Sequence, residues 1–314
     1  MLRTPRLPLA DETTIRPGHV LLLLGVAFVW GFNFVVIKVG LESFPPLLFS
    51  ALRFGLIAFP AVLFVPRPNV PWRDLVTLGL IFGVVLFGLL FVGIHAGVPP
   101  GLASLVMQTH VLFTIVLGVV LLGERPQAIR WLAVGLGFAG IALLVFEAGT
   151  PSQLWALALV LGGAFAWGIS NLLLRRVPAS DMAAVMIWLS LVPPVPLMVL
   201  SALFEGPERI ATALSALSWT GVAAVAYTGF LSTVFAYGAW GAMLRRYPVS
   251  VVTPYALLVP IFGLGSAALF LGERFSGIDI AATLLVLLAL LVNIIAPKLA
   301  RASSLARSAG RRPS

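Results

Sequence analysis

Residues 98–125 read VPPGLASLVMQTHVLFTIVLGVVLLGER, a run almost free of charge that ends abruptly in Gly-Glu-Arg. A run of this length and polarity predicts a helix that crosses the roughly 30 Å hydrocarbon core of a bilayer. The same pattern returns near the other end of the chain, where residues 248–274 read PVSVVTPYALLVPIFGLGSAALFLGER. The two runs are interpreted as equivalent helices in the two halves of an internal repeat.

The composition indicates an integral membrane protein. Of 314 residues, 60% are hydrophobic and 10% are charged, whereas a soluble domain carries about 25% charged residues. The net charge of +9 is spread over short loops and tails, which fits the topology role of Lys and Arg better than nucleic-acid binding. The chain has no cysteine, so disulfides and thiolate metal sites are excluded. No P-loop motif is present, so ATP is not the expected energy source within this chain.

Ten apolar runs follow one another, and each is long enough to span a bilayer. They cover about 19–38, 46–65, 74–94, 98–122, 128–146, 153–174, 182–203, 219–242, 248–271 and 278–296. Because the runs are continuously apolar and do not alternate, they predict helices and not a barrel. The expected fold is an all-α membrane protein with ten transmembrane helices and polar tails at 1–18 and 297–314.

The basic residues predict the orientation. With the N-terminus inside, 16 of the 20 Lys and Arg residues fall in cytoplasmic segments, and only Lys38, Arg209 and Arg274 fall outside. Basic residues concentrate on the cytoplasmic side of membrane proteins. The expectation is a multi-pass membrane protein with both termini in the cytoplasm.

A second echo supports the repeat. Residues 28–33, Phe-Val-Trp-Gly-Phe-Asn, return at 165–171 as Phe-Ala-Trp-Gly-Ile-Ser-Asn. Each half, 19–147 and 153–296, then holds five spans, and an odd number makes the halves enter the membrane from opposite sides. Inverted repeats are typical of alternating-access transporters, whose site lies where the halves meet. The alternative explanation of such a duplication is structural stability alone.

Several motifs resemble those of a known family: residues 30–38 (WGFNFVVIK), Pro45-Pro46-Leu47, Leu52-Arg53-Phe54, residues 101–105 (GLASL) and the two Gly-Glu-Arg endings. They look like the EamA-type permeases of the drug/metabolite transporter superfamily, and most closely like O-acetylserine/cysteine exporters. The resemblance covers about 19–296. It implies a ten-helix protein of the cell (inner) membrane, made of two five-helix EamA units, that exports amino acids or related metabolites, with other metabolites or drugs as the alternative. Thr109-His110 after Gln108 departs from the family pattern.

Two ionisable residues are predicted to lie within the membrane. His110 lies near the middle of its run, where an ionisable group is costly and is a candidate for function. It would either couple export to proton movement or remain a neutral histidine that is hydrogen-bonded between helices, and Gln108 points to another face. Arg53 would bind a substrate carboxylate, snorkel outward, or pair with Glu42 or Glu147.

The other candidates are aromatic, amide and proline residues inside the runs. Trp30, Asn33, Trp167 and Asn171 would line a cavity by cation–π and amide contacts, or would only pack helices together. Tyr227, Tyr237 and Tyr255 are weighed in the same way, as cavity lining or as packing. Pro254 and Pro260 are predicted to kink the ninth run and act at a gate, and Pro193, Pro194 and Pro196 to break the seventh.

The partners expected are therefore a small-molecule substrate and the lipid bilayer, without nucleic acid, cofactor or metal. An intramembrane enzyme is disfavoured, because the carboxylates sit at loops and helix ends and the three histidines form no ligand spacing. A channel or a non-transporting scaffold remains the alternative class.

Overall fold

The computed structural model describes residues 15–175, 177 and 182–309, with the backbone alone beyond residue 296. Within these ranges all regular structure is helical. The described residues contain nine helices that are long and apolar enough to cross a membrane, and a bent pair of shorter helices, taken as one span, brings the number to ten. This confirms the all-α fold that the sequence predicts.

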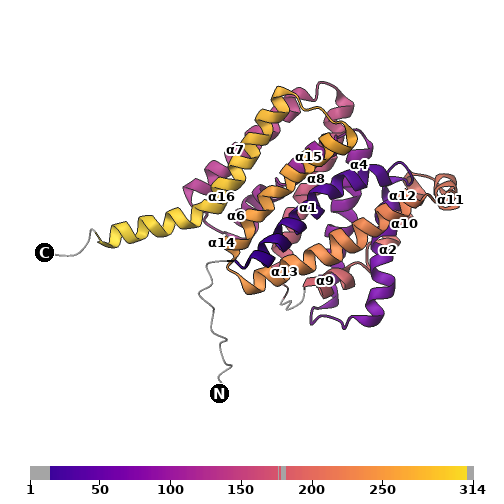
Figure 1. Cartoon of the computed structure of the whole chain (residues 1–314), viewed down its shortest axis with the longest axis horizontal. Coiled ribbons are helices and arrows are strands. Elements are labelled where there is room, and N and C mark those ends of the chain that lie inside the picture. Colours follow the sequence, from indigo (N-terminus) through magenta and orange to yellow (C-terminus); the bar gives the residue numbers. More distant parts are fainter. Residues whose placement is uncertain (1–14, 176, 178–181, 310–314) are drawn as a thin grey trace, which may run out of the picture.

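The ten spans are built from the helices labelled in Figure 1. The first five are α1 (Pro17–Gly40); α2 (Pro46–Phe64); α3 (Trp72–Leu78), η1 (Gly79–Leu86) and α4 (Phe87–His95); α5 (Pro100–Met107) and α6 (His110–Leu122); and α7 (Ala128–Glu147). The last five are α8 (Pro151–Leu174); α9 (Met182–Leu189) and α10 (Pro194–Phe204); α12 (Trp219–Ala226), η2 (Tyr227–Phe235) and α13 (Ala236–Arg246); α14 (Val249–Val252), η3 (Thr253–Leu257) and α15 (Leu258–Leu271); and α16 (Gly277–Ala309). A short helix, α11 (Pro207–Ser215), joins α10 to α12.

The two Gly-Glu-Arg corners end their helices in the same way. Gly123 closes α6 with φ 64° and Gly272 closes α15 with φ 67°. A left-handed residue at this position lets the next amides satisfy the last helical carbonyls, and glycine adopts it without a Cβ penalty. The glycine in each corner is therefore explained by the turn that it makes.

The two halves pack on each other reciprocally. A Cβ added to Gly31 of α1 would lie 2.7 Å from the Val259 carbonyl oxygen of α15, so the two backbones are in close contact. A Cβ added to Gly168 of α8 would lie 3.3 Å from the Thr114 amide nitrogen of α6. Each glycine follows the tryptophan of its Trp-Gly motif, and each contacts the Gly-Glu-Arg span of the other half. In Figure 1, α7 and α16, which end the two halves, run side by side.

The Gly-Glu-Arg corners lie at opposite ends of the fourth span. Glu273 accepts a hydrogen bond from the Gly101 amide (3.1 Å) at the beginning of that span, whereas Glu124 follows its end. Equivalent corners are thus on opposite faces of the bundle, as an inverted repeat requires.

Five spans depart from a continuous α-helix. The third and eighth contain π-helical turns, η1 and η2. The fourth is interrupted at Gln108-Thr109 and the ninth by the 3₁₀ turn η3, which contains Pro254. The seventh is bent by 42° between α9 and α10, at the proline cluster. Helix α15 continues through Pro260, so the break of the ninth span lies at Pro254 and not at Pro260.

The C-terminal helix is longer than the apolar run predicts. Its spanning part is Gly277–Ala296, and the helical backbone continues to Ala309. It projects from the bundle at the C-terminal end in Figure 1. Residues 297–309, which the sequence assigns to a tail, are therefore helical, while 1–14 and 310–314 lie outside the described residues.

Candidate functional site

Two adjoining cavities lie between the halves. The central cavity has a volume of about 300 Å³, and a second cavity of about 630 Å³, here called the vestibule, adjoins it. Gln108, His110, Trp240 and Ala256 line both cavities and so mark their junction. A largely apolar cavity of this size with a few polar groups has the usual properties of a small-molecule site.

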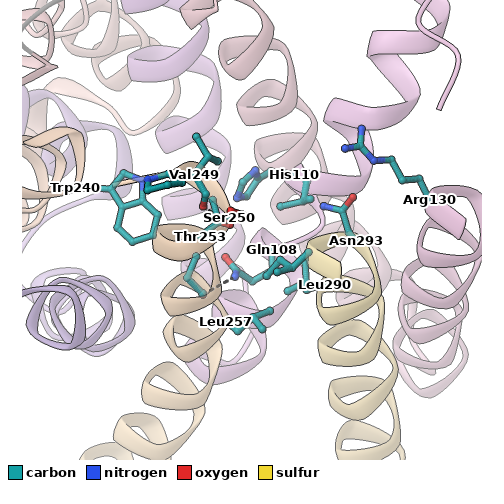
Figure 2. A pocket seen from close by; sticks show the side chains of 14 residues that line it. Gln108, His110, Arg130, Trp240, Val249, Ser250, Thr253, Leu257, Leu290 and Asn293 are labelled. Carbon is teal, nitrogen blue, oxygen red and sulfur yellow. Dashed lines mark hydrogen bonds between the residues drawn. The ribbon is translucent and has the colours of Figure 1, made fainter. Parts of the chain in front are cut away.

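The vestibule opens at one end of the bundle only. Arg130 in the first turn of α7 and Ser250 at the start of α14 line it, together with Asn293 near the end of the spanning part of α16. Figure 2 shows Ser250, Thr253 and Asn293 gathered around His110, with Arg130 farther out. All of these elements begin or end at the face that carries the Glu124 corner.

The opposite half of the interface is closed by small residues. A Cβ added to Gly263 of α15 would lie 2.5 Å from the Ser104 Cβ of α5, and one added to Gly101 would lie 3.1 Å from the Ala267 Cβ. Ser104 and Ala267 are fully buried. Close approach through small residues is the usual way in which membrane helices seal together. The cavities are thus open to one face and shut from the other.

Tryptophans from two spans form one wall of the central cavity. The ring of Trp30 lies 5.0 Å from that of Tyr237 and 5.4 Å from that of Trp240. The Trp30 indole N–H donates to the Ser232 carbonyl at 3.0 Å, which fixes the ring on η2. The π-faces of such rings attract a cationic ligand group.

The other wall carries a stacked pair. The imidazole of His110 lies on the indole of Trp167, with ring centroids 4.0 Å apart and an interplanar angle of 22°. The Asn171 amide nitrogen lies 3.1 Å from His110 Nδ1 and donates to Thr114 Oγ1 at 3.1 Å. Trp167, Asn171 and His110 therefore form one unit across α6 and α8.

Two further amides line the central cavity. Gln108 donates from Nε2 to the Ala256 carbonyl at 3.2 Å, the dashed line in Figure 2, and so joins the breaks of the fourth and ninth spans. Asn33 is 6% exposed, and its Oδ1 has no hydrogen-bond partner among the described residues. A buried acceptor without a partner is costly, and a ligand donor would satisfy it.

Arg53 lies outside the lining of both cavities. Its guanidinium is 1% exposed and donates to the Thr228 carbonyl (3.0 Å) and to Thr233 Oγ1 in η2. It also lies 4.0 Å from the centre of the Phe87 ring. In the described residues it makes no ion pair with Glu42 or Glu147. Its contacts hold the first half of the chain to the π-helical turn of the second.

The three tyrosines have different positions. Tyr237 lines the central cavity, while Tyr227 donates to the Val29 carbonyl at 2.9 Å and joins η2 to α1. Tyr255 packs against a cluster around Leu23 and Met243 and lines neither cavity. The sequence spacing places Tyr227 and Tyr237 near one face of a regular helix, but the π-helical turn between them changes their relative angle. Pro254 and Pro260 also lie outside both linings.

Sequence reasoning missed six polar or aromatic lining residues: Arg130, Ser232, Trp240, Ser250, Thr253 and Asn293. Asn293 had a usable signal, because it is an amide within an otherwise apolar run. Trp240 lies three residues after Tyr237 on the same helical face. Arg130 and Ser250 sit at the beginnings of helices, where sequence alone does not distinguish a loop residue from a cavity residue.

The electrostatics of the site are one-sided. No Asp or Glu is among the described residues that line the two cavities, and Arg130 is the only residue there with a permanent charge. At the closed face, burial raises the pKa of the Glu273 carboxyl, against the opposing effects of the Gly101 amide and of Lys38. The cavity therefore attracts anionic groups at its mouth, and its described lining offers π-faces and neutral oxygens to cations.

Comparison with known proteins agrees with this arrangement. The EamA-like transporter family matches the chain twice, over residues 18–146 and 154–295. A protein named "Probable amino-acid metabolite efflux pump" from Salmonella typhimurium is 40% identical over 280 residues, covering 87% of this chain and 93% of its own. One with the same name from Escherichia coli K12 is 39% identical, covering 89% and 95%.

More distant relatives share the fold. An "Uncharacterized inner membrane transporter YedA" from Escherichia coli K12 is 29% identical, covering 82% of this chain and 84% of its own. A solved crystal structure superposes with a TM-score of 0.58 at 20% identity, covering 91% and 99% of the two chains. With both halves of the chain matched by one family, the protein is a multi-pass membrane protein that belongs to the EamA-like transporter family.

Proposed function

We propose that this protein exports small amino-acid metabolites across the cell membrane by alternating access. The observation that carries the proposal is a pair of cavities between two inverted halves, open to one face and sealed at the other. The curated relatives named above support the substrate class, since they match almost the whole chain and bear the name of amino-acid metabolite efflux pumps.

The lining suits a small zwitterion. Arg130 at the mouth attracts a carboxylate, and the indoles of Trp30, Trp167 and Trp240 offer π-faces to an ammonium group. Asn33 adds an amide oxygen without a partner. Cysteine- or O-acetylserine-like molecules have both groups on a small body, and other metabolites of the same superfamily are the second candidate.

Several finer features belong to the same proposal. The repeats are assigned to 19–147 and 153–296, and both termini to the cytoplasm, on the distribution of Lys and Arg. The vestibule then faces the cytoplasm, and the described conformation is the one that loads substrate. A proton gradient, exchange of metabolites, or downhill flux would supply the energy.

Uptake into proteoliposomes tests the proposal. Cysteine, O-acetylserine, threonine and an aromatic amino acid are offered as radiolabelled substrates, with and without a proton gradient. We expect saturable transport of at least one of them that empty liposomes lack. If no amino acid moves, the substrate class is wrong; flux that does not saturate would favour a channel.

A further inference from the structure

His110 has one ring nitrogen bonded and one free. Its Nδ1 lies 3.1 Å from the Asn171 amide nitrogen, and no described residue bonds its Nε2. The ring lies at the junction of the central cavity and the vestibule, so the free nitrogen is available to a ligand. The hydrogen-bond partners of Asn171 determine the protonation state of the His110 ring.

Thr114 fixes the orientation of the Asn171 amide. The Thr114 hydroxyl donates its only hydrogen to the His110 carbonyl at 2.7 Å, so Oγ1 is left as an acceptor for Asn171 at 3.1 Å. The Asn171 atom that faces both Thr114 and the imidazole must therefore be the NH₂ group, which donates one hydrogen to each. Turning the amide over would place its oxygen there, and Thr114 would have to give up its bond to the His110 carbonyl.

The tautomer follows from this geometry. Because an NH₂ group faces Nδ1, this nitrogen must accept, and the ring hydrogen is on Nε2. An imidazolium has no acceptor nitrogen and would lose the bond. Stacking on Trp167 is compatible with both the neutral imidazole and the imidazolium, since an indole face also attracts cations. The bond to Asn171 therefore determines which of the two forms is present.

The surrounding charges act in the same direction. Besides His110, the titratable or charged residues that line the two cavities in the described part of the chain are Arg130 of α7 and Tyr237 of α13. On α8, Arg175 lies beyond the helix end and pairs with Glu124 at 2.8 Å, and α16 presents the neutral Asn293. Among the described residues, no carboxylate lines either cavity to favour an imidazolium.

We propose that His110 is a neutral recognition residue whose fixed Nε2–H donates to the carboxylate of the substrate, and that it is not the proton carrier of transport. Asn171 and Thr114 are the positioning residues that hold the tautomer. The expected substrates are therefore monocarboxylates. The carboxylate of the substrate first meets the Arg130 guanidinium and then leaves it to bind the His110 N–H. The carboxylate part rests on the proposed function, whereas the tautomer is measurable without transport.

Nitrogen NMR of the ¹⁵N-histidine protein in nanodiscs tests the tautomer. The chain has three histidines, and the spectrum of His110→Gln assigns the signal by its absence. We expect a neutral ring with hydrogen on Nε2 from about pH 5.5 to 8, the range in which an unperturbed histidine titrates. An imidazolium signal in that range, or hydrogen on Nδ1, would overturn the proposal and leave the export function untouched.

Variants of Asn171 test whether its bond to Nδ1 sets the tautomer of His110. Asn171→Asp places a carboxylate opposite Nδ1, which should move the hydrogen to Nδ1 and create an imidazolium within the same pH range. Asn33→Asp is the matched control, because it adds the same charge to the central cavity at a side chain whose Oδ1 bonds to no described residue, His110 included. Equal effects of the two variants on the His110 signal would show that the Asn171 bond does not set the state.

Binding completes the test. His110→Leu removes the donor and should weaken binding of a carboxylate substrate about tenfold or more, with the pH profile unchanged. His110→Gln keeps an N–H near the position of Nε2 and should bind within about threefold of the wild type. A changed pH profile in both variants, at normal expression, would assign proton coupling to His110 and refute the proposal.

Discussion

The two Gly-Glu-Arg corners have the same sequence and different surroundings. At the closed face, Glu273 is half-buried and accepts from the Gly101 amide at the beginning of α5. At the open face, Glu124 is exposed and pairs with Arg175, whose side chain is also exposed. The same glutamate position thus contacts the beginning of α5 at one end of the bundle and makes an exposed ion pair at the other.

The difference indicates how the protein changes state. Gly101 and Ser250 occupy equivalent positions before the two corners, as do Glu124 and Glu273. If the halves exchange conformations, Glu124 will accept from the Ser250 amide at the start of α14, and Glu273 will be released. Ser250 now lines the open vestibule, with space for that movement.

The largest effect is expected at the close backbone contact between α1 and α15. Gly31→Ala places a Cβ 2.6 Å from the Phe262 Cβ and 2.7 Å from the Val259 carbonyl oxygen, so α1 and α15 must separate. Gly25→Ala adds the same methyl to the same helix with nothing within 4 Å. We expect transport by Gly31→Ala to fall about tenfold or more, since overpacking costs about 1–3 kcal/mol, while Gly25→Ala remains near wild type. Equal rates for the two would refute the tight seal.

A smaller effect is expected when the buried corner loses its hydrogen-bond acceptor. Glu273→Ala removes the group that accepts from the Gly101 amide at the start of α5, and a hydrogen bond of this kind is worth about 0.5–1.5 kcal/mol. The outer face should then open more often, by up to about tenfold in population. Glu208→Ala on α11 is the control, because this carboxylate is exposed. Cysteine labelling at the outer, closed face measures how often this face opens. Identical labelling of the Glu273 variant and the Glu208 control would contradict the prediction.

The same corner predicts a pH effect of known sign. Burial raises the pKa of Glu273 while the face is closed, so the closed state favours the protonated carboxyl. Lowering the pH through the range just above the usual carboxyl value should stabilise closure, and raising it should favour opening. Pulsed EPR between labels on Ala96→Cys and Leu269→Cys, in this cysteine-free chain, measures the distance. A pH response that persists in Glu273→Gln would assign the effect elsewhere.

The smallest effect is expected at the exposed corner, with the opposite sign. Glu124→Ala removes an exposed ion pair worth about 0–1 kcal/mol and also the acceptor that the opposite state needs. The open vestibule should become slightly more populated, whereas Glu273→Ala makes it less populated. Paired labelling of the vestibule compares the two variants, and a shift in the same direction would break the equivalence of the corners.

Sequence predicted the parts of this architecture that depend on periodicity and polarity. The ten spans follow from the lengths of the apolar runs, and the repeat follows from the recurring Trp-Gly motif. The bend of the seventh span follows from its prolines, which lack a backbone hydrogen-bond donor. The break at Gln108-Thr109 contains no proline, so nothing in the sequence predicts it. The π-helical turns have no distinctive composition, and they change which of Tyr227 and Tyr237 reaches the cavity.

Residue roles were harder to predict than elements. An arginine within an apolar run suggests either a ligand site or an ion pair, and Arg53 instead bonds to Thr228 and Thr233 through a contact between distant spans. Asn171, the polar partner of the His110 ring, lies about sixty residues away in sequence, and only the folded chain brings the two together. The role of a residue such as Ser250 depends on the conformation of the bundle, which the sequence does not show.

The central claim, exchange between two equivalent conformations, is tested most directly by cysteine labelling at one pair of equivalent residues. Ser104 is buried against Gly263 in the closed half, and Thr253 holds the same place in the repeat and lines the vestibule. Without substrate, the account predicts that Thr253→Cys reacts with a membrane-impermeant maleimide from the open face and that Ser104→Cys is protected. Saturating substrate during turnover should slow the first reaction and make Ser104→Cys reactive from the other face. Unchanged labelling of both residues in a transporting protein would contradict the account.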